Sequence, residues 1–286
     1  MTGAVLAAEL GTLLSAERVD LARAALVVAK IEYPKLDPDR TIARLDALGD
    51  RAHGRLNALA DSSVAARVEA LNRLLFEEEK FEGNRRHYGD FRNSLLNVVL
   101  ERRTGMPISL AVVYIEVARR AGLEVFGVSF PGHFLLRVPA DAGDAGGPLI
   151  LDPFEGGRRL GEHDCRDLLQ RHVGDDAEYD ASLVEACPPR QIVGRMLNNL
   201  KRTYVELRSY PHARAVTELL LSVGPSFGSD LRDRGLIAYH LDDYQAALRD
   251  LEQYLRLRTW QDGDREERDR VVEHVRTLRG RVASLN

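Results

Sequence analysis

The stretch TGMPISLAVVYIEVARRAGLEVFGVSFPGHFLL, residues 104–136, decides the fold of this 286-residue chain. Pro107 suits the first position of a helix, and the residues from Ile108 to Ile115 are apolar on nearly every side except at Ser109. A helix with apolar side chains all round is normally buried. We therefore predict a helix that begins at Pro107, lies in the protein core and ends near Gly122.

After Gly122 the hydrophobic pattern changes from that of a helix to that of strands. The runs LEVFGVSF (123–130), HFLLRV (133–138) and LILD (149–152) are short and rich in β-branched or aromatic residues. Pro131-Gly132 and a Gly/Asp/Ala loop at 139–148 separate them. This pattern predicts a buried helix packed on a small antiparallel sheet.

Residues 16 to about 101, upstream of this helix, read as short amphipathic helices. Asp37 is a candidate N-cap with Pro38 at the first helical position, and Ser62 or Ser63 can cap the next helix. The stretch FEGNRRHYGDFRNSLLNVVLERRTG (81–105) shows turn chemistry followed by a helix that stops at Gly105.

The C-terminal third carries an internal repeat. An offset of 34 residues maps Tyr210 onto Tyr244, and it also maps Leu197, Leu207, Ala213 and Leu221 onto identical residues at 231, 241, 247 and 255. A period of 34 is that of the tetratricopeptide repeat, a pair of antiparallel helices. We predict two repeats, at about 194–227 and 228–261, followed by a charged capping helix.

The composition narrows the possible partners and compartment. The 40 basic and 44 acidic residues leave a formal charge of −4, which argues against nucleic acid as a partner. No run approaches the roughly 18 apolar residues of a membrane span, and the first 30 residues lack the basic start of a signal peptide. The two cysteines do not suggest a disulfide framework, so we expect a cytoplasmic protein without membrane contact.

Three residues are candidates for a catalytic triad: Ser109, His133 and Asp152. Ser109 lies in the first helical turn, where the helix dipole and unpaired amides favour negative charge on a nucleophile. His133 begins one predicted strand and Asp152 ends another, so adjacent strands would place a base beside the carboxylate that orients it. The order nucleophile, histidine, aspartate resembles that of the transglutaminase-like, or papain-like, core.

The chain as a whole resembles the bacterial SirB-type family. The match is carried by GNRRHYGDFRNSLLNVVLERRTGMPISLAVVYIEVARRAGL, GVSFPGHFLLRV and ILDPFEGGRRL, followed by the repeats, and it covers roughly residues 17–260. Phe91 stands where the family pattern has proline. The resemblance implies an α+β protein, in which a transglutaminase-like core with a helical N-terminal segment is followed by an all-α tetratricopeptide-repeat module.

The resemblance also implies a domain organisation. Residues 1–100 form a helical segment packing on the core, residues 101–187 form the core, and residues 190–286 form the two repeats and their capping helix.

In the parent fold the position of Ser109 is a cysteine, and this difference bears directly on activity. A cysteine beside histidine at a helix start is already ionised to a thiolate before it reacts. A serine must lose its proton during the attack and therefore needs a well-aligned base. We therefore expect a weakly active or non-catalytic domain in a protein-binding or regulatory protein. The alternative is a serine-dependent hydrolase or acyl-transfer enzyme using Ser109, His133 and Asp152.

The remaining motifs point to no cofactor and no metal. The eight histidines form no HExxH motif, the two cysteines form no CxxC pair, and no phosphate-binding glycine loop is present. Cys165, in GEHDC, reads as a free thiol on a loop or at a helix start. FEGGRRL (154–160) reads as a turn with solvated arginines.

The repeats suggest a protein or peptide partner. Arginines with an asparagine on a concave helical face suit an acidic peptide. The alternative, that this face is only solvated, is equally compatible with the sequence. Two repeats fall below the roughly three needed for independent stability, so a partly structural role also stays open. The positions predicted to line this groove are Arg195, Asn198, Arg202, Arg232, Tyr239 and His240, with Val205, Glu206 and Ser229 beside them.

Overall fold

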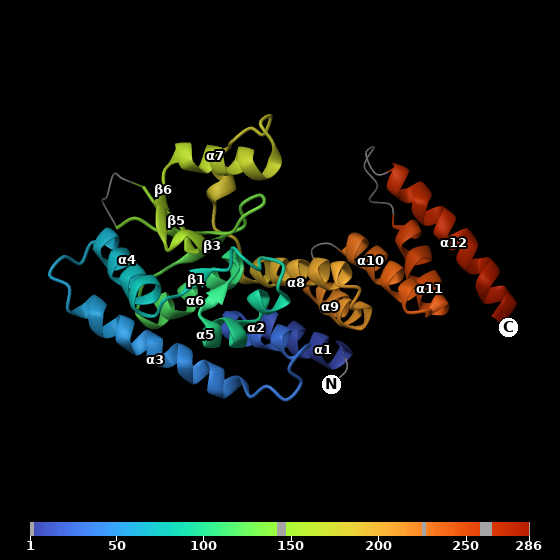
Figure 1. The fold of residues 1–286 in the computed structure, drawn as a ribbon, viewed down its shortest axis with the longest axis horizontal. Helices are drawn as coiled ribbons and strands as arrows, with labels where there is room; N and C mark the ends of the chain where they lie inside the picture. Colours follow the sequence, from blue (N-terminus) through green and yellow to red (C-terminus); the bar gives the residue numbers. More distant parts are fainter. Residues whose placement is uncertain (1–2, 142–146, 225–226, 258–264, 286) are drawn as a thin grey trace. The chain divides into compact units, whose positions relative to one another are not determined.

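The computed structural model describes residues 3–141, 147–224, 227–257 and 265–285 (Figure 1). The chain divides into two compact units, one made of residues 16–196 and the other of residues 1–15 with 197–286. In the unit of residues 16–196, β1 (Glu82–Gly83) and β2 (Thr104–Gly105) form a parallel sheet. A second sheet, antiparallel throughout, contains in order β3 (Phe126–Val128), β4 (Leu135–Val138), β5 (Leu149–Asp152) and β6 (Arg158–Leu160). The α-helices are α1 (Gly3–Leu14), α2 (Leu21–Ala29), α3 (Pro38–Asn57), α4 (Val64–Asn72), α5 (Leu96–Arg102), α6 (Pro107–Arg120), α7 (Glu162–Val173), α8 (Pro189–Glu206), α9 (Tyr210–Val223), α10 (Phe227–His240), α11 (Tyr244–Arg256) and α12 (Arg265–Leu285).

Helix α6 is the buried helix predicted from the opening stretch. Pro107 is its first residue, and every residue from Pro107 to Tyr114 is buried. The helix ends at Arg120, and Gly122 follows with a φ of +77°, a left-handed conformation that glycine adopts without strain. Helices α2, α3 and α5 pack around α6 together with strands β3 and β4.

The antiparallel sheet lies between α6 and α7, which confirms the predicted packing of a buried helix on a small sheet (Figure 1). Leu136 pairs with Leu151 across β4 and β5, and Ile150 pairs with Leu160 across β5 and β6. The sheet face toward α7 forms one apolar cluster with that helix: Val128, Phe130, Leu135, Ile150, Leu160, Cys165, Leu168, Leu169 and Val184.

Strand β6 corrects the interpretation of FEGGRRL as a turn alone. Gly156 and Gly157 do form the turn, with φ values of +67° and +76°. Arg158–Leu160 then return along β5, so that both arginines lie on a strand with exposed side chains.

The predicted helix starts are present. The Asp37 carboxylate accepts a hydrogen bond from the Asp39 N–H at the start of α3, with Pro38 as the first helical residue. Of the two candidate serines, Ser63 caps α4 through the Ala66 N–H. Phe91 begins a 3-10 helix, η2 (Phe91–Ser94), after Asp90 as its N-cap. Three further short helices are η1 (Arg73–Glu78, a π-helix), η3 (Pro153–Glu155) and η4 (Ala181–Val184).

Ion pairs of Glu79 join the end of η1 to α3 and to the residue before β2. The Glu79 carboxylate binds the guanidinium groups of Arg51 and Arg103, and Arg103 also donates to the Glu79 carbonyl at 2.9 Å. Burial alone would raise the pKa of Glu79, but the hydrogen bonds from Arg51 and Arg103 outweigh burial and hold that pKa below its usual value.

Glu79→Gln is therefore expected to lower the free energy of unfolding by about 1 kcal/mol at pH 7, since both arginines are partly exposed and screened. A carboxylate with a depressed pKa stabilises the fold above its unfolded pKa and loses that contribution as pH falls through the folded pKa. In urea titrations the difference between wild type and variant should shrink as the pH falls through the folded pKa of Glu79 and should be absent once that carboxyl is protonated in both states. The exposed neighbour Glu77 serves as control, because Glu77→Gln should leave stability unchanged at every pH.

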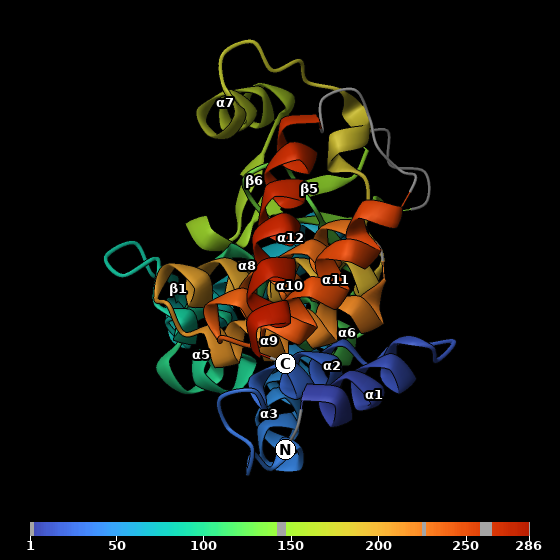
Figure 2. The same ribbon diagram turned by 90° about the vertical axis from the view of Figure 1, so that its right-hand side faces the viewer.

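The unit of residues 1–15 and 197–286 contains the predicted repeats. Helices α9 and α11 begin at Tyr210 and Tyr244, 34 residues apart, and the residues with a positive φ just before them, Arg208 and Asp242, repeat at the same spacing. Helices α10, α11 and α12 lie side by side (Figures 1 and 2). Val271, Val275 and Leu278 of α12 pack into the cluster around α10 and α11, as a capping helix should.

The first fifteen residues differ from the expected domain boundary. Helix α1 packs against α9, and residues 1–15 cluster with the repeats instead of with the unit of residues 16–196. Leu6, Leu10 and Leu14 are the buried residues of α1, spaced four apart on one face. This spacing shows that a partner must cover one side of the helix, but it does not name the partner.

Candidate functional site

The structure brings His133 and Asp152 together. The Nε2 atom of His133 lies 3.0 Å from each carboxylate oxygen of Asp152, and both side chains are buried. Asp152 also accepts hydrogen bonds from the N–H groups of Phe154 at 2.9 Å and Glu155 at 3.4 Å, as the N-cap of η3. Because Nε2 faces the carboxylate, Nδ1 is the ring nitrogen that would serve as a base.

Ser109 lies at the start of α6, as predicted, but its hydroxyl is engaged locally. The Oγ atom donates toward the Asn93 carbonyl at 2.6 Å, has the Met106 carbonyl at 3.0 Å and accepts from the Met106 N–H at 3.1 Å. The residue is fully buried. Among the residues that the structure describes, Ser109 makes no hydrogen bond with His133.

A pair of asparagines holds the segment that covers Ser109. The Asn84 amide donates to the Asn93 side-chain oxygen at 3.0 Å, and the Asn93 amide donates to the carbonyls of His87 and Tyr88. These contacts fix the Asn93 carbonyl beside the Ser109 hydroxyl. Sequence reasoning did not single out either asparagine, although both lie in the quoted stretch GNRRHYGDFRNS and polar side chains next to a buried helix start are a usable signal.

Aromatic and basic side chains surround the His133–Asp152 pair. Phe154 contacts His133 edge-on, Tyr88 packs edge-on against Phe154, and the Arg85 guanidinium lies 5.5 Å from the Phe154 ring centre. His172, from α7, approaches His133 with its ring centre 5.5 Å away. None of these four residues was predicted, because they come from three separate segments: the loop after β1, η3 and α7.

Arg195 corrects the predicted peptide groove. Its guanidinium donates to the Ser129 hydroxyl at 2.9 Å, the Phe130 carbonyl at 2.7 Å and the His133 carbonyl at 2.5 Å. The side chain therefore holds the loop that carries His133 and is not available to a peptide. A guanidinium with five donors suits a loop with several free acceptors, which the repeat pattern cannot show.

The other predicted groove residues divide into two groups. Arg232 binds Asp233 and Glu267, and Tyr239 packs against His274 of α12, so both contact their own unit. Asn198, Arg202 and His240 are exposed, and the His240 ring stacks on Tyr210 at 4.4 Å.

Burial disfavours ionisation of both cysteines. Cys165 lies within α7 and Cys187 just before α8, and both are buried and free. Burial raises the pKa of each thiol to about 11. In the described part of the chain, no group of three His, Cys, Asp or Glu side chains is placed to hold a metal ion.

Of the helices in the described ranges, none has both the length and the apolar character needed to span a bilayer.

Comparisons with known proteins agree with this architecture. Residues 39–198, more than half of the chain, match the family model of the transglutaminase-like superfamily, and residues 200–278 match a tetratricopeptide-repeat model. A UPF0162 protein of Xylella fastidiosa is 39% identical over 84% of this chain and 85% of its own length. A UPF0162 protein of Pseudomonas aeruginosa is 35% identical, with coverages of 85% and 87%.

A third relative carries the name expected from the sequence motifs. Protein SirB1 of Salmonella typhimurium is 28% identical over 70% of this chain and 76% of its own length. The buried helix, the His133–Asp152 pair on its sheet and the two repeats all fall within the matched residues. The chain therefore belongs to the transglutaminase-like superfamily, among the UPF0162 and SirB-type proteins that join this domain to C-terminal tetratricopeptide repeats.

Proposed function

We propose that the transglutaminase-like domain has little or no catalytic turnover and that the chain acts as a protein-binding, regulatory protein through its repeats. The observation that carries this proposal is the Ser109 hydroxyl, which donates to the Asn93 carbonyl at 2.6 Å and accepts from the Met106 N–H at 3.1 Å. These bonds occupy its proton and a lone pair.

Serine chemistry explains why this arrangement opposes catalysis. A serine nucleophile must pass its proton to a base within hydrogen-bond reach at the moment of attack. The Ser109 proton is directed to a backbone carbonyl, and breaking that bond would leave the buried Asn93 carbonyl with only the longer bond from the Met106 N–H, at 3.3 Å. In this proposal the Ser109 hydroxyl stabilises the start of α6, and the His133–Asp152 pair holds the segment before β4 against the end of β5.

The test compares the wild-type chain with Ser109→Ala and Ser109→Cys. We expect no labelling of the wild type by a fluorophosphonate probe, because the hydroxyl is buried and engaged. Ser109→Ala is expected to lower the free energy of unfolding by about 1 kcal/mol, since the Met106 N–H and the Asn93 carbonyl each lose one partner and keep only each other, at 3.3 Å. Ser109→Cys is expected to react with iodoacetamide no faster than Cys165 or Cys187 do, because position 109 is fully buried and, among the described residues, no hydrogen bond joins it to His133.

The alternative, a serine-dependent hydrolase or acyl transferase, is favoured by the His133–Asp152 geometry alone. Labelling of wild-type Ser109 by the fluorophosphonate, lost in His133→Ala but kept in Asp175→Ala, would establish that alternative and refute the proposal. Asp175 is exposed and makes a suitable control.

The proposed binding face is the exposed surface of α8 and α10 around Asn198, Arg202 and His240. With Arg195 and Arg232 engaged within the protein, Arg202 is the arginine that supports the proposed preference for acidic segments. A photo-crosslinking residue at position 202 should trap a discrete protein, and an acidic peptide should compete with it. The same residue at position 249, on α11, should trap none; equal trapping at both positions would count against this face.

A reducing compartment such as the cytoplasm suits the proposed protein, since Cys165 and Cys187 are both free thiols.

A further inference from the structure

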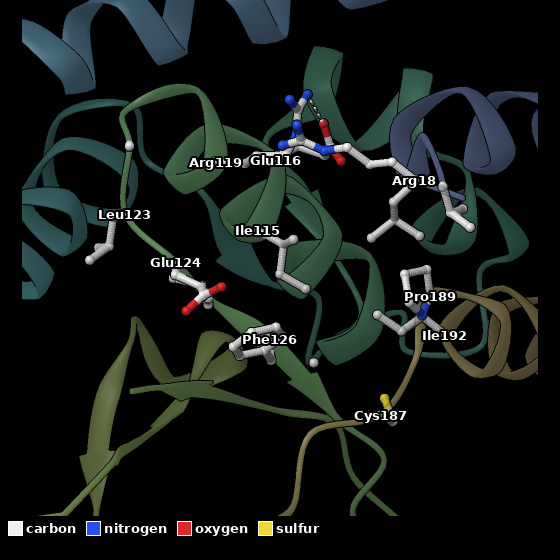
Figure 3. Close-up of a pocket in the computed structure, with 15 residues that line it drawn as sticks. Arg18, Ile115, Glu116, Arg119, Leu123, Glu124, Phe126, Cys187, Pro189 and Ile192 are labelled. Carbon is white, nitrogen blue, oxygen red and sulfur yellow. Dashed lines mark hydrogen bonds and ion pairs between the residues drawn. The ribbon is translucent and has the colours of Figure 1, made fainter. Parts of the chain in front are cut away.

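A cavity of about 420 Å³ lies beside strand β3, in the unit of residues 16–196 (Figure 3). Its size falls within the range of ligand-binding pockets. Six consecutive residues, 122–127, line one side, so the wall there is backbone as well as side chain. No member of the Ser109, His133 and Asp152 set lines it, so it is independent of the function proposed above.

Strand β3 is an edge strand of the four-stranded sheet, and its outer edge is covered at Gly127 but not along the residues that precede the strand. The strand pairs with β4 on one side, and on the other side it makes a single bridge, in which the Gly127 carbonyl accepts from the Cys187 N–H at 2.8 Å. Two prolines follow Cys187 and have no N–H to continue the pairing. The edge therefore stops being covered just where the cavity begins.

The residues before Gly127 continue the strand geometry along the cavity. Leu123 and Val125 are buried while Glu124 and Phe126 are exposed, which is the two-residue alternation of an extended chain. Gly127 directs its carbonyl away from β4, so Val125, two residues earlier, directs its own N–H and C=O to the same open side. Within the described residues, neither of these Val125 groups has a hydrogen-bond partner.

Apolar side chains from three other segments face this open edge. Leu21, Ile115 and Ile192 line the cavity, and Figure 3 shows Ile115 and Ile192 pointing into it. A methyl group on Gly127 would lie 2.8 Å from Ile192 Cδ1, so the face shared by Gly127 and Val125 is the one that meets this apolar wall. A strand added beside Val125 would place every second side chain against that wall.

The charges at the rim are unevenly distributed. Arg18, Glu116 and Arg119 gather at the upper rim in Figure 3, and Glu124 lies on the opposite side. The buried Glu116 carboxylate is bound by Arg119 at 3.0 Å and by Arg120 at 2.5 Å. Arg18 is exposed and has no ion pair among the described residues, so the upper rim has an excess of positive charge.

We propose that the cavity receives an extended peptide that adds to β3 at Val125. Its backbone pairs with the Val125 N–H and C=O, an apolar side chain enters between Ile115 and Ile192, and an acidic group sits beside Arg18 and Arg119. Main-chain pairing to an exposed edge, with pockets for alternate side chains, is a general mode of peptide recognition.

The experiment titrates the full chain with a blocked hexapeptide of aspartate followed by alternating threonine and valine. Saturable binding by calorimetry and roughly tenfold slower hydrogen exchange at the Val125 amide are expected. The same peptide with N-methylated valines cannot pair as a strand and should not bind. Replacement of its aspartate with lysine should weaken binding about fivefold.

Matched variants test the charge assignment. Arg18→Glu should weaken binding of the aspartate peptide about fivefold and strengthen binding of the lysine peptide, whereas Arg40→Glu, an equal charge change at an exposed position of α3, should leave both unchanged. Binding of the N-methylated peptide, no protection of Val125, or binding of octanoate without binding of the peptide would each overturn the proposal.

Discussion

Asp152→Ala is expected to lower the free energy of unfolding of the transglutaminase-like unit by about 3 to 4 kcal/mol. The substitution removes a buried carboxylate that binds His133 at 3.0 Å and accepts from the N–H groups of Phe154 and Glu155. It leaves a buried imidazole and two amides short of an acceptor, which is the costly way to lose a hydrogen-bond network.

Urea titration followed by far-UV circular dichroism measures this effect. Asp152→Asn, which keeps an acceptor oxygen, should lose less than half as much stability, and Asp175→Ala on the exposed surface should lose none. A double-mutant cycle with His133→Ala should give a coupling energy of about 1 to 3 kcal/mol. A coupling near zero would show that the His133–Asp152 contact contributes nothing and that only the turn depends on Asp152.

Arg195→Ala should cause the second largest loss, about 2 to 3 kcal/mol. One guanidinium binds the Ser129 hydroxyl and the carbonyls of Phe130 and His133, so its removal frees three acceptors on the loop between β3 and β4. The same loss should loosen His133, which can be followed through its imidazole resonances in NMR spectra.

Two variants separate this role from a simple change of charge. Arg195→Lys keeps the charge but cannot span three acceptors, so it should recover less than half of the lost stability. Arg159→Ala removes an exposed arginine on β6 and should be neutral. If Arg195→Lys behaves like the wild type, the charge alone matters and the geometry described for the guanidinium does not.

The elements that follow directly from local sequence patterns could be predicted. The turns after Pro107 are apolar except at Ser109, which favours a buried helix, and Pro131-Gly132 favours a turn between two strands. The 34-residue spacing of Tyr210 and Tyr244 reflects a repeated helical hairpin that packs on its own copy. Each of these signals lies within one segment and depends on no distant partner.

The site was predictable only in part, for a physical reason. Asp152 is the last residue of β5, and His133 lies in the loop two residues before β4 and not within the predicted strand, so the pairing of β4 with β5 already brings the two side chains close together. The partner of the Ser109 hydroxyl is a backbone carbonyl at Asn93, and every residue has such a carbonyl. The type of side chain at position 93 therefore does not predict that the Asn93 carbonyl bonds to Ser109. That bond depends on the conformation of the loop.

The predicted groove residues illustrate the same limit for arginine. A helical position shows which way a side chain leaves the backbone, but a long guanidinium can turn toward any acceptor nearby. Arg195 turns to the His133 loop and Arg232 to Glu267, whereas Arg202 stays exposed. The repeat pattern treats all three as equivalent.

Arg208 and Asp242, which have positive φ values, affect how the repeat module can change in length among related proteins. Because both stand immediately before a cap residue, Ser209 or Asp243, the segment 209–242 begins and ends at equivalent points of the backbone. Duplication or deletion of a gene segment encoding these 34 residues would rejoin the chain in the same conformation. We therefore expect the repeat module of related proteins to gain or lose whole hairpins while the residues around His133 and Asp152 keep their spacing.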